Sequence, residues 1–192
     1  MKKINFMEII FYSAAACLTA FMILATYDGL YLHLWKFELF RVEESKFEHK
    51  THTIRAILFP AIIWLLFLNT DGISFWIGIL FVATDLVVLG MDAYSEKDSR
   101  TFMGGLPRWE YIVHLFANGF HFAAIALILG IRIVGYTSGE GVVTSDFSKE
   151  LLQFVAENTI PGAILLAFLH VILITAKGQK GWSIIRSKVK CC

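Results

Sequence analysis

The chain has 192 residues, of which 57% are hydrophobic, and a net charge of +1. This composition excludes an ordinary soluble domain, and the near-zero charge gives no reason to expect a nucleic-acid partner. The cysteines, Cys17, Cys191 and Cys192, are placed too unevenly for a disulfide framework or a zinc knuckle. We therefore expect an all-α fold and a single integral membrane domain over residues 1–192.

Five apolar segments approach or exceed the length of about 20 residues that crosses a bilayer. The first looks like a signal peptide, but its apolar core is longer than usual, so we expect a retained span. The expected spans cover residues 9–35, 52–68, 73–91, 109–134 and 159–176, followed by a basic tail over 177–192. Four of these spans are expected to form a bundle. The connection over 135–158 suits a short amphipathic helix before the fifth span.

Lysine and arginine are concentrated on one side of this predicted topology, in the loops after the first and third spans and in the tail. The other side has Lys2, Lys3, Arg132 and Lys149. The positive-inside rule therefore predicts a cytoplasmic C-terminus and an external N-terminus, and we expect a bacterial inner (plasma) membrane. In this topology all six histidines lie in the cytoplasmic half of the protein.

Helical periodicity places acidic and imidazole side chains on one stripe of each of the first four spans. At about 100° per residue, Glu110, His114 and His121 lie within about 40° of one another. By the same geometry, Asp28 faces away from His33. The four stripes comprise Asp28 with Tyr31; Glu48, His52 and Arg55; Asp85 and Asp92; and Glu110, His114 and His121.

These carboxylates need a compensating partner, because an acidic side chain at the bilayer centre costs about 2.5–3.5 kcal/mol. A metal ion supplies one, since it binds carboxylate and imidazole groups together. We predict a metal site and expect His49 to lie outside it as an interfacial residue. The roles of His33 and His170 stay open. The predicted metal ligands are Asp28, Glu48, His52, Asp85, Asp92, Glu110, His114 and His121.

A short internal repeat points to the kind of centre. "FEHKTH" opens the second span and "WEYIVH" opens the fourth, and in each a histidine follows a glutamate by four residues. This layout resembles that of ferritin-like di-metal carboxylate bundles, in which Glu-x-x-His motifs and further glutamates line the core. The spacing of four and the aspartates Asp28 and Asp85 depart from that pattern. The resemblance implies a di-metal centre, for which iron is favoured and zinc or manganese is compatible.

We expect a membrane-embedded, metal-dependent oxidoreductase that acts on a hydrophobic or lipid-like substrate. Tyr31 would then relay protons or electrons, and Arg55 would hold an anionic group. Two alternatives remain: a zinc-dependent membrane hydrolase, and a non-enzymatic protein that handles ions or protons or binds haem. The expected partners are membrane lipids and a hydrophobic small molecule, and a homo-oligomer is compatible with the sequence.

Overall fold

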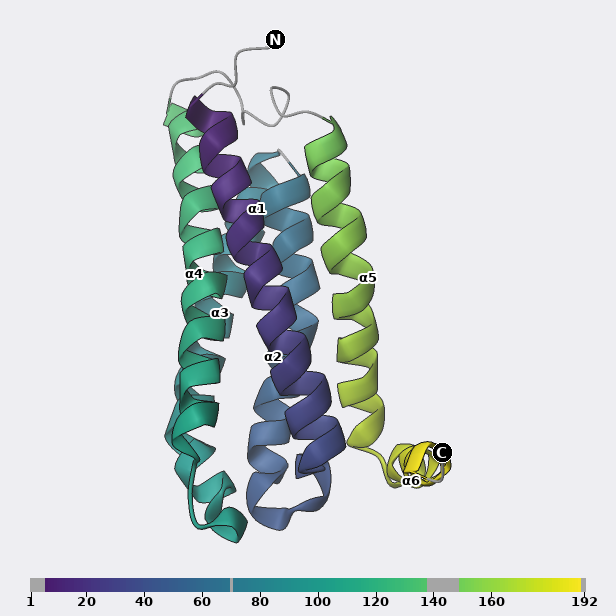
Figure 1. Cartoon of the computed structure of the whole chain (residues 1–192). Helices are drawn as coiled ribbons and strands as arrows, with labels where there is room; N and C mark the ends of the chain where they lie inside the picture. The colour runs from purple at the N-terminus through teal and green to yellow at the C-terminus, as the bar shows by residue number, and fades with distance from the viewer. Residues whose placement is uncertain (1–5, 70, 138–148, 191–192) are drawn as a thin grey trace.

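The computed structural model describes residues 6–69, 71–137 and 149–190, and its regular elements there are all helical. Figure 1 shows the long helices side by side and α6 (Ala176–Lys190) at an angle to them, beside the end of α5. Four residues used in the sequence analysis lie outside the described residues: Lys2, Lys3, Cys191 and Cys192. Within these described residues, five helical segments are long and apolar enough to cross a membrane.

The long helices include several short irregular segments. α1 (Phe6–Ala25) continues as the π-helix η1 (Thr26–Lys36), and short 3₁₀ turns η2 (Leu39–Arg41) and η3 (Glu43–Ser45) lead into α2 (Lys46–Ile63). A second π-helix, η4 (Trp64–Leu68), ends that segment. Then follow α3 (Gly72–Ser99), η5 (Thr101–Met103), α4 (Arg108–Thr137) and α5 (Lys149–Leu173).

Three of the expected spans differ in extent from the helices of the structure, and the second begins at Lys46 of α2 instead of near residue 52. α3 continues to Ser99 instead of ending near residue 91, so the acidic segment after Met91 is helical. α5 begins at Lys149. Residues 149–158, which were expected to belong to a separate amphipathic helix, therefore form the start of α5. The rest of that expectation lies outside the described residues. The basic tail forms α6, whose Trp182 packs against Leu34 and Phe40.

The apolar core occupies the half of the bundle near the start of α1. It is built from buried side chains that include Phe11, Leu18, Ile62, Phe67 and Ile128. Because apolar side chains fill this half of the bundle, the buried polar side chains lie mainly in the other half.

Hydrogen bonds hold the connection between η4 and α3 in place at the apolar end of the bundle. Asp71 is the N-cap of α3, and its carboxylate accepts a hydrogen bond from Ser74 N at 2.8 Å. Hydrogen bonds from the Ser74 side chain and backbone hold the pKa of the Asp71 carboxyl below its ordinary value. The buried Arg132 of α4 donates to the backbone oxygens of Asn69 and Asp71. Arg132 is therefore far from the predicted metal ligands, as expected from its position 22 residues after Glu110.

Candidate metal centre

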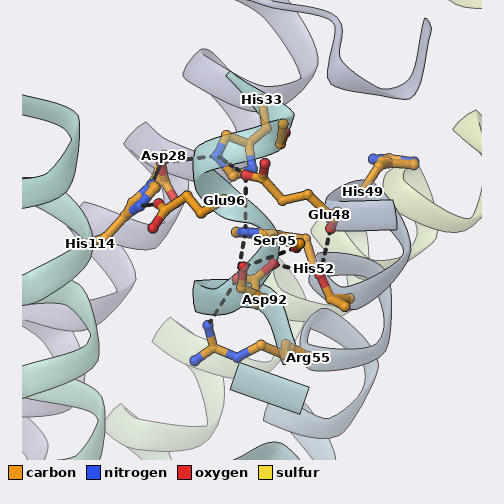
Figure 2. A network of polar contacts seen from close by, with 12 residues as sticks. Asp28, His33, Glu48, His49, His52, Arg55, Asp92, Ser95, Glu96 and His114 are labelled. Atoms are coloured by element: carbon orange, nitrogen blue, oxygen red, sulfur yellow. Dashed lines mark hydrogen bonds and ion pairs between the residues drawn. The ribbon is translucent and has the colours of Figure 1, made fainter. Parts of the chain in front are cut away.

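The centre of the polar half is a set of five side chains, called here the His33 cluster: Asp28, His33, Glu48, His52 and His114. Among the described residues, they form two overlapping groups of three with ligand atoms close enough to hold a metal ion, namely Asp28, His33 and His114, and His33, Glu48 and His52. Each group contains two imidazoles and one carboxylate. Figure 2 shows His33 between the two groups.

The distances within the first group are short. His114 Nε2 lies 2.9 Å from Asp28 Oδ1, and His33 Nε2 lies 3.3 Å from the same oxygen. Glu96 reaches the other ring nitrogen of His114, Nδ1, from α3. This carboxylate orients the imidazole, as an outer carboxylate does for many metal-bound histidines.

The second group is formed mainly by one face of α2. His33 Nε2 lies 3.6 Å from Glu48 Oε1, and His52 Nε2 lies 3.8 Å from the same oxygen. Asp92 of α3 lies 3.1 Å from His52 Nε2, and Thr51 donates a hydrogen bond to Asp92. Asp92 thus lies on the same ring nitrogen of His52 that faces Glu48, whereas Glu96 binds the ring nitrogen of His114 that faces away from Asp28.

His33 was expected to point away from Asp28, and that expectation is wrong. It assumed α-helical geometry, in which residues five apart lie about 140° apart around the helix. The segment Thr26–Lys36 is instead a π-helix, whose hydrogen bonds join residues five apart. Asp28 and His33 thus fall on the same face, and both are buried.

Arg100 is a central residue that the sequence interpretation missed. It was counted as a loop cation, yet its side chain is 0% exposed. It donates to both Glu48 oxygens, at 2.5 and 2.9 Å, and to Glu110 Oε1. Its Nη2 also lies 3.2 Å from His33 Nε2. Helical spacing could not indicate this role, because Arg100 lies in the turn that follows α3 and not on a helix face.

Glu110, His114 and His121 do face inward from α4, but the structure brings each to a different partner. Glu110 binds Arg100, and His114 joins the His33 cluster. His121 lies 3.1 Å from Asp85, and Arg55 binds the other oxygen of Asp85 at 3.1 Å. These last residues form a second set, the Asp85 cluster: Arg55, Asp85, Asn118 and His121.

The remaining candidates lie at the margin. Tyr31 is 46% exposed and stacks on Tyr27, so the structure does not bring it to the His33 cluster. His49 is buried, with Nε2 3.2 Å from the backbone oxygen of His170, and the expectation of an interfacial residue is wrong. The His170 ring stacks on the His49 ring at 5.1 Å, and His170 lines the cavity described next.

A cavity of ≈ 120 Å³ connects the two clusters. Its polar wall carries Asp28, His52 and His114 from the His33 cluster and the whole Asp85 cluster. Its apolar wall includes Phe21, Met22, Phe59 and Leu166. A ligand in this space therefore contacts hydrocarbon on one side and the candidate metal ligands on the other.

With neutral imidazoles, the charges around the cavity do not balance. Six carboxylates line the cavity or bind Arg100, and two guanidinium groups pair with them, so the formal charge is then −4. Buried carboxylates in such excess must take up protons or bind cations. Protons on the imidazoles that contact these carboxylates would reduce the excess, and two divalent ions would neutralise it. The carboxylates are Asp28, Glu48, Asp85, Asp92, Glu96 and Glu110, and the guanidiniums are Arg55 and Arg100.

Comparison with models of protein families, with curated proteins and with solved structures finds no match to this chain. The functional argument therefore rests on the geometry of the residues themselves.

Proposed function

We propose that this protein is a membrane-embedded, metal-dependent oxidoreductase that acts on a hydrophobic substrate. One observation carries the proposal: two groups of two imidazoles and one carboxylate overlap at His33, and Asp28, His52 and His114 of these groups line a cavity with an apolar wall. Two histidines and one carboxylate are the donor set typical of non-heme iron oxygenases. Iron is the favoured metal, and a pair of ions accords with the excess of four negative charges around the cavity.

The donor set fits such a centre. His33, His114 and Asp28 would hold one ion, and His52 and Glu48 with Asp92 a second. Glu48 can bind Arg100 and a metal together, because a carboxylate has about four lone-pair sites on its two oxygens. When bound, the iron would supply oxygen activation and electron transfer.

The protein's own residues would prepare the site for that chemistry. Arg100 donates hydrogen bonds to both carboxylate oxygens of Glu48 and so fixes the position of this candidate ligand. Arg55 is held between Asp85 and Asn118, at 3.1 and 2.9 Å, and lines the cavity where a polar substrate group would lie. The apolar wall, with Phe21 and Phe59, limits the entry of water and accommodates hydrocarbon.

Membrane insertion belongs to the same proposal. Large apolar side chains are exposed along the bundle, among them Trp76 at 61%, Leu80 at 62% and Val87 at 65%. A soluble protein rarely exposes apolar patches on this scale, whereas a lipid-facing surface does. We place the protein in the bacterial plasma membrane.

Elemental analysis and an optical spectrum of the protein purified in detergent test the proposed centre. Iron near stoichiometric amounts, with no haem absorbance, is the expected result. Zinc alone would instead favour the hydrolytic alternative. A protein that binds no transition metal after growth with iron, manganese and zinc would overturn the proposal.

A further inference from the structure

The helix α6 lies outside the candidate metal centre and differs in composition from the long helices. Figure 1 shows the long helices from the side and α6 almost end-on, beside the end of α5, so α6 runs crosswise to them. A helix with this direction lies along the surface of any bilayer that the long helices cross. α6 contains no acidic residue, and its basic residues are Lys177, Lys180, Arg186, Lys188 and Lys190.

Two contacts with the rest of the chain fix the rotation of α6 about its own axis. Trp182 is buried, and its ring lies 5.8 Å from the ring of Trp35 of η1. Arg186 forms an ion pair with Glu38, in the connection between η1 and η2. Trp182 and Arg186 therefore face the bundle, and helical geometry sets the directions of the other side chains.

Gly178 shows which side of α6 faces the spanning part of the protein. A Cβ at this position would collide with the backbone of Ile172, in the last turn of α5. Ile185 and Val189 follow Gly178 by seven and eleven residues, so they lie within about 20° of it around the helix. Both are exposed, at 54% and 56%. α6 thus carries an exposed apolar stripe that faces back along the bundle, toward the region beside α5.

The exposed lysines occupy the side of α6 that faces away from the bundle. Two of them lie about 160–180° from Arg186 around the helix and the third about 120° from it. Ser187, which is also exposed, lies about 180° from Gly178 and so faces away from the spanning helices. Apolar, basic and hydroxyl side chains thus follow one another around α6, an arrangement typical of a helix in a membrane interface. The exposed lysines are Lys177, Lys180 and Lys188.

We propose that α6 binds anionic phospholipid at the bilayer surface, with Ile185 and Val189 among the acyl chains and the exposed lysines on the phosphate groups. Charge identifies the lipid, because a basic helix without acidic residues is attracted to a negatively charged surface and gains little from a zwitterionic one. The apolar stripe favours a bilayer over an acidic protein or a nucleic acid, because it faces the region that lipid would occupy. The inference rests on the proposed membrane insertion and is independent of the metal chemistry.

Spin labels in nanodiscs measure the depth of two faces of α6. The full chain carries one label at a time, at Ile185→Cys or at Ser187→Cys, and collisions with oxygen and with a water-soluble nickel complex are compared. In discs that contain phosphatidylglycerol, we expect the label at 185 among the acyl chains and the label at 187 in water. Equal depths of the two labels would contradict the proposed orientation. The native cysteines are removed by Cys17→Ala, Cys191→Ser and Cys192→Ser.

Native mass spectrometry measures the choice of lipid in mixtures of phosphatidylcholine and phosphatidylglycerol. We expect tighter binding of phosphatidylglycerol, by about fivefold for each lysine that contacts a phosphate. The triple variant Lys177→Gln, Lys180→Gln, Lys188→Gln should lose this preference. The matched control removes the same charge from exposed positions at the same end of the bundle and should keep it; its substitutions are Lys50→Gln, Lys97→Gln and Arg108→Gln.

Two further results would overturn the lipid site. An equal loss of the preference in both triple variants would show that general surface charge, and not α6, selects the lipid. A label at 185 that is shielded from both oxygen and nickel would place α6 against another protein surface.

Alkaline extraction of native membranes separates this inference from the membrane insertion on which it rests. A chain that stays in the washed membranes spans the bilayer, and labels in water at both positions would then overturn the α6 inference alone. A chain released by the wash would overturn the membrane insertion as well.

Discussion

The half-buried His114 and the buried His49 provide a pair of histidines that distinguishes a metal ligand from a packing residue. His114 belongs to the His33 cluster, whereas His49 bonds the backbone of His170. We expect His114→Ala to lose most of the bound metal and to lower the melting temperature, because metal binding stabilises the native state. His49→Ala should lower the melting temperature but keep the metal. The measurements are the metal-to-protein ratio and thermal unfolding in detergent.

Two results for these variants would contradict the assignment of His114 as a metal ligand. Wild-type metal content in His114→Ala would remove His114 from the centre. Loss of metal from both variants to the same extent would mean that the content reports general unfolding instead of ligation.

Arg100 is the residue on which the polar half depends most for stability. It is fully buried and pairs with Glu48 and Glu110. Arg100→Gln leaves two buried carboxylates without their cation, which typically costs about 3–5 kcal/mol. Arg100→Lys should rescue little of this, because an ammonium group cannot form paired hydrogen bonds with two carboxylates at once.

The control for Arg100 lies at the same end of the bundle. Arg108 is exposed, and Arg108→Gln should change the free energy of unfolding by no more than about 0.5 kcal/mol. Denaturation in a mild detergent compares the three variants. Equal stability of Arg100→Gln and Arg108→Gln would contradict the buried position of Arg100.

Helix geometry decides which parts of the site could be predicted from sequence. The inward faces of Asp85, Asp92 and His121 follow from a spacing of seven residues on a regular helix, and the structure shows all three buried. His33 could not be placed because π-helical winding changes the angle between residues, and no pattern in residues 26–36 predicts it. Glu96 was missed because its polar surroundings resemble a loop, although they continue the helix α3.

The close approach of η4 and α3 is a second property of these elements that can be tested. A Cβ at Gly78 would lie 2.5 Å from Leu66 Cδ2, which is buried, whereas one at Gly90 would meet nothing within 4 Å. Gly78→Ala should therefore destabilise the protein by about 1–3 kcal/mol through overpacking. Gly90→Ala should be neutral or stabilising by up to about 1 kcal/mol, because alanine favours helix. Thermal unfolding of the two variants measures the difference, and equal effects would contradict this packing.

Arg132 tests whether the two ends of the bundle are independent. Its guanidinium donates hydrogen bonds to the backbone oxygens of Asn69 and Asp71 and so links them to α4 at the apolar end of the bundle. Arg132→Gln should lower the free energy of unfolding by about 1.5–3 kcal/mol, the usual range for hydrogen bonds to a charged group. Metal content should stay at the wild-type value. A loss of metal in a variant that remains folded would show that this connection also positions the metal centre.

At the scale of the whole molecule, the division into an apolar half and a polar half was predictable because it follows from the order of residues along each span. The histidines and the buried carboxylates of the His33 cluster gather at one end, together with α6. The connection of each residue to its partner was not predictable, because Arg100 reaches the cluster from a turn and not from a helix face.

The distribution of charge predicts an orientation of the bundle in a membrane, and this prediction can be tested directly. The end that carries the polar half has far more lysine and arginine than the opposite end, where Arg132 is tied to the α2–α3 connection. The positive-inside rule therefore predicts a cytoplasmic C-terminus. An epitope tag after Cys192 should resist protease in intact spheroplasts and be cleaved in inverted vesicles. The basic residues concerned include Lys36, Arg41, Lys46, Lys50, Arg108, Lys177, Lys180 and Arg186.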